Sequence, residues 1–375
     1  MKWKIPLYKI FTDRDDNKAV NKVLQRGMDW AIGHEIAEFE KKIANYIGTK
    51  YCVAFNSGTS AGHAALLAIN INSGEVIVPS FTFISTANWP LMVNAKPKFV
   101  DIEEENFGLS PERVKVEITK NTKAIIPIHY GGRPCKIIEI NRIARNKKIT
   151  LIEDCAESFG AKIKGVSVGT FGQMSIFSFA PNKILTTGEG GAICTDSRKI
   201  FEKLQLIRSH GRKVNENYFK TSQLPNYISI GYNWRMSSMT AALGLSQFDK
   251  LDRIIQLRRR HARFYVLKLK KINEIKLPDE PKDHLHVYQL FTIQLKNNLI
   301  RNELQKFLTS RGIMTKVFFE PIHLSNFYKK SGFGKKSLPN TEKISQTILS
   351  LPIFPGLKSE EIRYICDSIQ EFFQN

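Results

Sequence analysis

The stretch FSFAPNKILTTGEGG places Lys183 just after an apolar, strand-like run and just before a glycine-rich turn. A lysine at the end of a strand lies at the mouth of a sheet, where burial and neighbouring cations lower its pKa. The neutral amine can then attack an aldehyde. Gly188, Gly190 and Gly191 would allow the backbone to turn tightly beside it. The alternative interpretation is a surface lysine in a glycine-containing hairpin.

Asp154 closes the apolar run ITLIED, and a carboxylate at the end of a buried strand needs a partner or a function. An acid in that place can face the nitrogen of a pyridine ring and keep it protonated, so that the ring accepts electrons. The alternative is that Asp154 caps the following helix.

The segment NSGTS connects the apolar run YCVAF to the helix-like stretch AGHAALLAI. Backbone amides at a helix N-terminus bind anions. Gly58 permits close approach, and Ser57 or Thr59 can donate a hydroxyl to a phosphate. Ser178, at a strand end near Lys183, is a second candidate donor. The alternatives are a plain helix cap for the turn and a core position for Ser178.

An aromatic residue is expected to cover the site. The run PSFTFIST contains Phe81 and Phe83, one of which can stack on a pyridine ring, although aromatic residues in strands more often lie in the core. His63, His210 and His323 have no metal-ligand spacing, so the sequence predicts no metal site. A glycine–hydroxyl turn, an aromatic, an acid, a serine and a lysine follow one another along the chain. Together they predict a pyridoxal phosphate site.

The elements that must position these residues alternate. Seven short apolar runs end in Gly, Ser, Pro or Asp, and most are separated by stretches with helical periodicity: YCVAF, EVIVPSF, KPKFVDI, AIIPIHY, ITLIEDC, MSIFSF and GAICTD. This alternation predicts an α/β fold with a mostly parallel, seven-stranded sheet flanked by helices on both faces. Ligands of such sheets bind beyond the carboxyl ends of the strands.

A chain of 375 residues exceeds the usual size of one domain. We expect a boundary near Lys250, where the small-residue helix of GYNWRMSSMTAALGLSQFDKL gives way to a basic helix. Residues 1–250 would form an N-terminal arm and the large cofactor-binding domain. Residues 251–375 would form a smaller C-terminal α+β domain.

The composition excludes several classes of protein. The hydrophobic fraction of 42% is ordinary for a globular chain. The five cysteines are odd in number and widely spaced, which favours a reducing compartment over a disulfide framework. The first residues lack the apolar core of a signal peptide, and no apolar run is long enough to span a bilayer. We therefore expect a cytoplasmic protein without a transmembrane segment.

The net charge of +21 invites a nucleic-acid interpretation, but the basic residues are spread along the chain. The densest stretch, LRRRHARFYVLKLKK, is typical of a helix with a solvated basic face. The alternative is a surface field that attracts anionic substrates or anionic lipid headgroups. We predict no nucleic-acid partner.

The chain resembles the sugar aminotransferases of the DegT/DnrJ/EryC1/StrS type over nearly its whole length. The matching segments agree in order and spacing: IPLYK, AIGHEIAEFEKKIANYIGTKYCVAFNSGTSAGHAAL, PSFTFISTAN, FVDIE, LIEDCAESFGA, GTFGQMSIFSFAPNKILTTGEGGAICTD, RSHG, GYNWRMSSMTAALGLSQFDKLD and PIHLSNFY. The resemblance implies pyridoxal 5'-phosphate as cofactor, with pyridoxamine 5'-phosphate as its form between the two half-reactions.

The resemblance also implies roles for the residues named above. Lys183 matches the lysine that forms a Schiff base with the cofactor, and Asp154 matches the acid at the pyridine nitrogen. The ring-stacking and phosphate-binding positions are matched by Phe83, Ser57, Gly58, Thr59 and Ser178.

Further positions concern the neighbouring subunit and the substrate. Asn233 and Arg235, in GYNWRM, match a loop that reaches the cofactor phosphate of the partner subunit, which implies a homodimer with sites at the interface. Glu157 occupies a position where family members carry Gln, His or Glu near the cofactor, and it is also a candidate substrate contact. His323 matches a histidine on the substrate side.

The implied reaction moves an amino group from L-glutamate to a nucleotide-diphosphate keto sugar. EDCAES with Glu157, together with NKILTTGEGG, looks most similar to perosamine synthase-type enzymes, which aminate C4 of a 4-keto-6-deoxy sugar for cell-surface polysaccharides such as O-antigen. At Gln173, at Ala180 and Pro181, and at Phe318 the chain departs from the common pattern. These departures concern the expected sugar pocket and leave the cofactor chemistry intact.

Three alternatives stay open at this point. The acceptor can be a 3-keto sugar or a cyclitol. A dehydratase on the same fold would carry histidine where Lys183 stands. A non-enzyme, nucleic-acid-binding or regulatory protein on this scaffold would bind DNA or RNA in a salt-sensitive manner and would not need Lys183.

Overall fold

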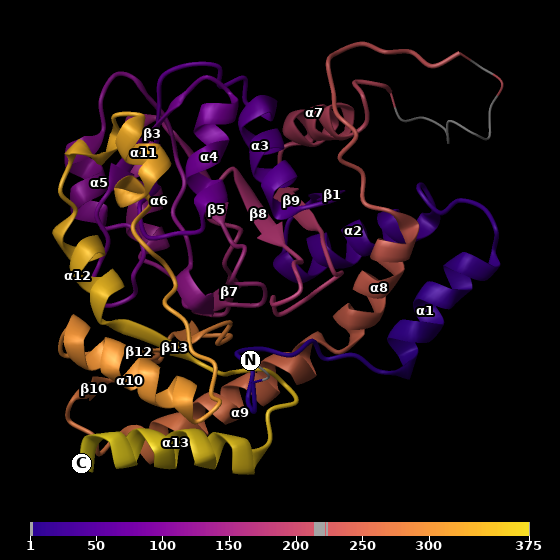
Figure 1. Cartoon of the computed structure of the whole chain (residues 1–375). Coiled ribbons are helices and arrows are strands. Elements are labelled where there is room, and N and C mark those ends of the chain that lie inside the picture. Colours follow the sequence, from indigo (N-terminus) through magenta and orange to yellow (C-terminus); the bar gives the residue numbers. More distant parts are fainter. Residues whose placement is uncertain (1–2, 214–221, 223, 375) are drawn as a thin grey trace.

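The structure is a computed structural model and describes residues 3–213, 222 and 224–374. Its centre is a seven-stranded sheet with the order β1-β9-β8-β5-β4-β2-β3 (Figure 1). The strands are β1 (Tyr51–Phe55), β2 (Glu75–Pro79), β3 (Lys96–Val100), β4 (Thr122–Ile125), β5 (Thr150–Asp154), β8 (Met174–Ser178) and β9 (Gly191–Thr195). All neighbouring pairs are parallel except those made by β9, which runs antiparallel to β8 and β1. The predicted mostly parallel sheet of seven strands is confirmed.

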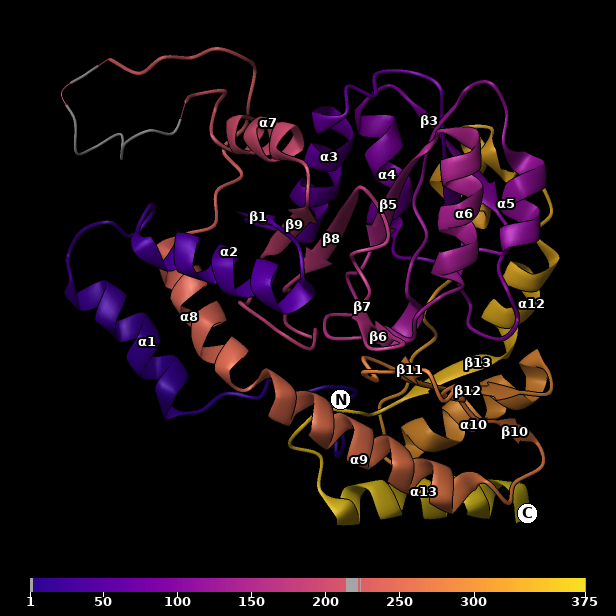
Figure 2. The ribbon, with the colours of Figure 1, turned by 180° about the vertical axis from the view of Figure 1, so that it is seen from behind.

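Helices cover both faces of this sheet, because successive side chains of a buried strand point to opposite sides. In β1, Cys52 and Ala54 enter one hydrophobic core, and Val53 and Phe55 enter the other. The first core is completed by α2 (His34–Ile47), α5 (Pro111–Glu117), α6 (Ile137–Lys147) and α8 (Ser238–Asp249). The second is completed by α3 (Gly58–Ala68), α4 (Ile84–Met92) and α7 (Arg198–Arg208). Figures 1 and 2 show the two layers from opposite sides.

Several helix ends follow directly from residue type. The side chain of Ser57 accepts a hydrogen bond from the amide of Ser60 at the start of α3. Gly48 ends α2 in the left-handed conformation, with φ 94°. These caps fix the points at which the chain leaves the helices next to the sheet. The helix α1 (Arg14–Gln25) begins with a capping box between Asp13 and Asp16, and it packs against α8.

The C-terminal part is built on a second, antiparallel sheet, as predicted for an α+β unit. Its strands are β10 (Ile275–Lys276), β12 (Phe291–Leu295) and β13 (Ile348–Leu351). Around this sheet lie α9 (Leu251–Leu269), α10 (Asn298–Ser310), α12 (Pro339–Thr347) and α13 (Ser359–Gln374). A short third sheet joins the C-terminal part to the segment between β5 and β8 of the large sheet. Its strands are β11 (His284–Leu285), β6 (Lys162–Ile163) and β7 (Val166–Ser167). Three short helical segments, η3 (Ile322–Leu324), α11 (Asn326–Lys330) and η4 (Phe333–Lys335), complete the C-terminal chain, and η1 (Tyr130–Gly132) follows β4.

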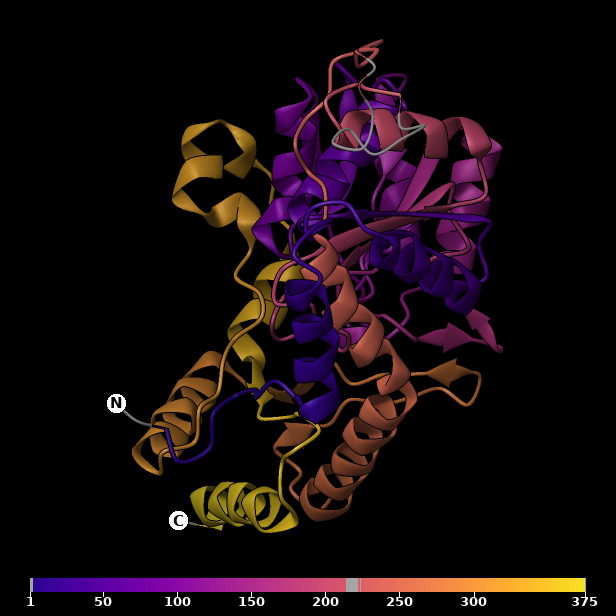
Figure 3. The same ribbon diagram turned by 90° about the vertical axis from the view of Figure 1, so that its right-hand side faces the viewer.

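The domain boundary near Lys250 remains a prediction, and the structure adds contacts that cross it. The helix α8 ends at Asp249 and α9 begins at Leu251. Ile5 packs in the core of the C-terminal part, and Figure 3 places the N-terminus beside that part. Conversely, Tyr328 packs in a core of the large sheet. No helix among the described residues has the length and apolarity needed to cross a membrane.

Candidate active site

One cavity of roughly 370 Å³ lies beyond the carboxyl ends of the central strands. Eight of the residues predicted from the sequence line it: Ser57, Gly58, Thr59, Phe83, Asp154, Glu157, Ser178 and Lys183. They come from five different loops and strand ends, so only the folded sheet brings them together. Their individual roles remain predictions, and the geometry below tests whether they fit a phosphorylated pyridine aldehyde.

Asp154 is the last residue of β5 and is buried at the base of the cavity. Its Oδ2 accepts a hydrogen bond of 2.7 Å from the hydroxyl of Thr86, and its Oδ1 accepts one of 3.1 Å from the amide of Ala156. Burial raises the pKa of Asp154, and the Thr86 and Ala156 hydrogen bonds and the charge of Lys183 oppose that rise only in part. A ring N–H cation at this carboxylate would satisfy it, which fits the expected pyridine nitrogen.

Lys183 lies in the loop between β8 and β9, where its amide donates to the carbonyl of Ala180. Its Nζ lies 3.5 Å from Oε1 of Glu157, and both side chains are largely buried. The other oxygen of Glu157, Oε2, accepts a hydrogen bond of 2.9 Å from the amide of Gly131. The lysine amine is therefore held at a defined place inside the cavity rather than exposed in a hairpin.

The N-terminus of α3 forms one wall of the cavity. The first amides of a helix have no partner within the helix and carry a partial positive charge, so they suit a phosphate. Gly58 packs so closely on Ser178 that an added Cβ would lie 3.0 Å from the Ser178 Cβ. The turn before α3 can therefore approach the end of β8 closely because position 58 is a glycine. This arrangement fits a phosphate cradle made of backbone amides and the hydroxyls of Thr59 and Ser178.

The structure distinguishes the two phenylalanines of PSFTFIST. Phe81 is fully buried in a core cluster, whereas 61% of Phe83 is exposed at the edge of the cavity. A large aromatic side chain left exposed beside a cavity is available to stack on a planar ligand. Phe319 lies next to it, with 6.5 Å between the ring centroids.

Two predicted residues of the GYNWRM loop do not line the cavity. Asn233 forms a backbone bridge with Ser209, and Arg235 forms one with Phe55. The guanidinium of Arg235 donates to the hydroxyl of Ser209 at 3.2 Å. Burial, together with the neighbouring guanidinium groups of Arg212 and Arg208, lowers the pKa of Arg235. Arg235 therefore lies outside its own cavity, beside the guanidinium groups of Arg208, which pairs with Glu40, and of Arg212.

His323 also lies outside the cavity, so its placement does not support contact with the substrate. It is buried in η3, where Nδ1 bonds to the hydroxyl of Ser80 at 2.7 Å and Nε2 faces Oε1 of Glu342 at 3.4 Å. Burial lowers the pKa of His323, although Glu342 opposes this. Both ring nitrogens are engaged, so the imidazole ties η3 and α12 to the end of β2.

The cavity includes residues that the sequence reasoning missed. Thr86, which donates to Asp154, lies one helical turn after Phe83, but its spacing alone did not identify it. Asn182 precedes Lys183 and lines the same cavity. Phe318 and Phe319 come from the C-terminal part, far along the chain, and no local motif marks their position. Phe318, noted as a departure from the family pattern, does line the cavity.

A buried group of His129, Glu153 and Cys155 has the side-chain types of a metal site. Glu153 accepts hydrogen bonds of 2.7 to 2.8 Å from three backbone amides, those of Gly169, Phe171 and Gly172, and lies 3.2 Å from Nε2 of His129. The other nitrogen of His129 accepts from the amide of Cys135. These donors and acceptors are satisfied within the protein, so we assign the group to anchoring the end of β5.

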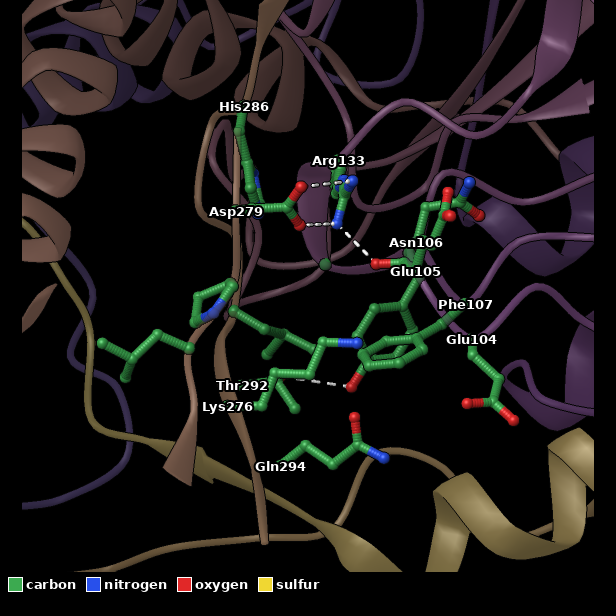
Figure 4. Close-up of a pocket in the computed structure, with 15 residues that line it drawn as sticks. Glu104, Glu105, Asn106, Phe107, Arg133, Lys276, Asp279, His286, Thr292 and Gln294 are labelled. Atoms are coloured by element: carbon green, nitrogen blue, oxygen red, sulfur yellow. Dashed lines mark hydrogen bonds and ion pairs between the residues drawn. The ribbon is translucent and has the colours of Figure 1, made fainter. Parts of the chain in front are cut away.

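A second pocket, of about 40 Å³, lies between the Tyr130 turn and the C-terminal part (Figure 4). Arg133 pairs there with Asp279 and donates to the carbonyl of Glu105. The hydroxyl of Tyr130 lies 3.2 Å from that of Thr292. Because this space is small and these polar groups bind one another, it is not a second candidate active site.

The chain is similar to known proteins over nearly its whole length. A model of the DegT/DnrJ/EryC1/StrS aminotransferase family matches residues 11–370. GDP-perosamine synthase of Escherichia coli O157:H7 is 35% identical over 373 residues, which cover 99% of each chain. The structure of PseC from Helicobacter pylori, an aminotransferase involved in the biosynthesis of pseudoaminic acid, superposes with a TM-score of 0.92 at 26% identity and covers 100% of both chains. NtdA from Bacillus subtilis, solved with bound cofactor PMP, has a TM-score of 0.88 at 28% identity, covering 96% of this chain and 82% of that one.

Proposed function

The chain belongs to the DegT/DnrJ/EryC1/StrS aminotransferase family, and from that premise we propose that it transfers the amino group of L-glutamate to a nucleotide-diphosphate keto sugar. It is a transaminase whose cofactor is pyridoxal phosphate. The products are 2-oxoglutarate and an amino sugar. The observation that carries the proposal is the meeting of Lys183, Asp154 and the α3 N-terminus in one cavity.

The bound cofactor supplies an aldehyde for amine exchange and a ring that accepts electrons from the carbon that loses a proton. The side chains of this chain do the rest. Asp154 would hold the proton on the ring nitrogen, and Phe83 would be placed to stack on the ring. The amides at the start of α3 would bind the phosphate. The amine of Lys183 would act as base and then as acid, taking a proton from the α-carbon of the donor and giving one back.

For the acceptor we propose the C4 carbonyl of a 4-keto-6-deoxy sugar, used in making a cell-surface polysaccharide such as O-antigen. The support is the identity to a perosamine synthase over nearly the full chain, together with Glu157 in EDCAES. The net charge of +21 suits a nucleotide-diphosphate substrate. All five cysteines are free and buried, which supports the cytoplasm as its location.

The test is a panel of nucleotide-linked 3-keto and 4-keto sugars, each offered with nitrogen-isotope-labelled L-glutamate. We expect the label in the product of a 4-keto sugar, with the new carbon–nitrogen bond at C4 by NMR. If the label appeared only in a 3-keto sugar or cyclitol product, the C4 proposal would be contradicted, but the proposed aminotransferase activity would stand. No label transfer to any acceptor by the cofactor-loaded protein would contradict the reaction itself.

We also propose a homodimer in which Asn233 and Arg235 serve the cofactor phosphate of the partner subunit. Arg235 lies outside its own cavity, and its guanidinium is a chemically suitable partner for a phosphate. Exposed apolar side chains precede the loop: Leu224, Tyr227, Ile228 and Ile230. Such residues favour burial against another protein surface.

Mixing two inactive variants tests this arrangement. Lys183→Ala and Arg235→Ala chains, unfolded and refolded together, should recover about a quarter of the wild-type specific activity, because one site in the mixed dimer has both side chains. A mixture of Lys183→Ala with the Lys183→Ala/Arg235→Ala double variant is the control and should stay inactive. An Arg235 that acts within its own chain would give no recovery in either mixture.

A further inference from the structure

A short segment of the C-terminal part, His286–Leu290, lies against two loops of the active site; we call it the clamp segment. The side-chain amide of Gln289 donates a hydrogen bond of 2.6 Å to the carbonyl of Asn182, the residue before Lys183. The amide of Leu290 donates to the carbonyl of Gly131 at 3.1 Å. The clamp segment thus contacts both the lysine loop and the turn that contains Gly131.

These two contacts meet again inside the cavity. Gly131 donates its amide to Oε2 of Glu157, and Oε1 of Glu157 lies 3.5 Å from Nζ of Lys183. The clamp segment therefore reaches both partners of this contact through one residue each. Asn182 connects it to Lys183, and Gly131 connects it to Glu157. A shift of Gln289 against Gly131 would change the distance between the amine and the carboxylate.

The clamp segment is itself fixed by a buried cation. Arg258 of α9 is 3% exposed, and its Nη1 donates to the carbonyls of Tyr288, Gln289 and Ile353 at 3.1 to 3.3 Å. Within the described part of the chain it has no carboxylate partner, and burial lowers its pKa to about 10. A buried charge without an acid is costly, and the three carbonyl contacts of Nη1 offset part of that cost, while Nε is buried without a hydrogen-bond partner among the described residues.

The backbone of the clamp segment also adopts an uncommon conformation. Tyr288 has φ 49°, in the left-handed region that residues other than glycine seldom occupy. Its amide donates to Nδ1 of His286 at 3.0 Å, and the two rings stack with 3.9 Å between centroids. Such a conformation persists only where its surroundings hold it. It places the Gln289 side chain toward the lysine loop.

We propose that Gln289 and Arg258 are positioning residues that set the distance between the Lys183 amine and the Glu157 carboxylate. Nε2 of Gln289 is the atom that faces the Asn182 carbonyl, because two carbonyl oxygens at 2.6 Å would repel each other. Gln289 is 3% exposed and does not line the cavity, so it acts through the backbone and not on the substrate. The inference rests on the proposed function of Lys183.

The test is Gln289→Leu, which keeps the size of the side chain and removes the donor. We expect kcat to fall on the order of tenfold with little change in KM for L-glutamate, because misplacement slows the proton transfers without removing a substrate contact. The pH midpoint of the cofactor's visible absorbance should fall, since a more distant Glu157 stabilises the protonated linkage less. Arg258→Lys should change both quantities in the same direction, because one ammonium cannot reach three carbonyls in the same way.

The matched control is Gln294→Leu. Gln294 lies on β12 and donates to the hydroxyl of Thr347 at 3.3 Å, away from the active-site cavity. It also removes the donor of a glutamine side chain in the C-terminal part, and it should leave kcat and the absorbance midpoint unchanged. A folded Gln289→Leu protein with wild-type kcat and a wild-type absorbance midpoint would overturn this inference but not the proposed function. A wild-type protein that neither binds the cofactor nor turns over would overturn the proposed function as well.

Discussion

Lys183→Ala is expected to reduce turnover by on the order of 10³- to 10⁶-fold, with the fold intact. Among the described residues that line the cavity, Lys183 alone carries an amine, so no neighbour replaces it as base and acid. The measurement is kcat with L-glutamate and a nucleotide-linked 4-keto sugar. Mass spectrometry after borohydride reduction should find the cofactor on Lys183 in the wild type and on no residue in the variant.

Two controls sharpen this prediction. Lys164→Ala removes a lysine whose side chain is 71% exposed, and it should retain wild-type turnover. Added small amines should partly restore the rate of Lys183→Ala, because they can enter the space that the side chain leaves. A Lys183→Ala protein that retains full activity would show that the amine is not the reacting group.

Asp154→Asn is expected to lower kcat on the order of 10²- to 10³-fold, because a neutral amide does not hold the ring nitrogen protonated. The substitution keeps the local hydrogen bonds. The amide oxygen can accept from Ala156, and the amide nitrogen can donate to the hydroxyl of Thr86. The loss is therefore attributable to the charge, measured as kcat and as the absorbance of the bound cofactor.

The same variant should be more stable than the wild type when both lack the cofactor. Burial raises the pKa of Asp154 in the folded protein above its unfolded value. Its contribution to stability is therefore complete below the unfolded pKa and is lost as the pH rises through the folded pKa. We expect Tm of cofactor-free Asp154→Asn to exceed that of the wild type at pH 8, and the difference to shrink toward pH 4.

Asp101→Asn is the matched comparison. Asp101 is also buried, but it accepts hydrogen bonds from the amides of Ile102, Asn340 and Thr341 and from the Thr341 hydroxyl, outside the cavity. Its replacement should lower Tm and leave the cofactor absorbance unchanged. Equal losses of stability in both variants would contradict the assignment of Asp154 as a carboxylate kept for chemistry at a cost in stability.

Much of the sheet and the core of the site follow from local pattern. Short apolar runs that end in a polar residue identified β1 to β5, β8 and β9, and the strand ends supplied Asp154 and Ser178. The positions of Thr86 and Gln289 did not follow, because each acts through a partner distant along the chain. The residue pattern alone left Phe81 and Phe83 open, because their difference in exposure depends on how the chain packs around α4. His323 illustrates a different difficulty. It was named from a matching motif, yet its ring lies outside the cavity lining.

The end of β5 bears two adjacent carboxylates with opposite surroundings. Glu153 is saturated by three amides and an imidazole on one side of the sheet, whereas Asp154 faces the cavity on the other. A deletion of one residue upstream in this strand would bring Asp154 to the position of Glu153 beside the glycine turn, and Glu153 to the position of Ile152 in the hydrophobic core. The cavity would lose its carboxylate and the core would gain one, so the length of the strand between Thr150 and Asp154 is fixed by both residues.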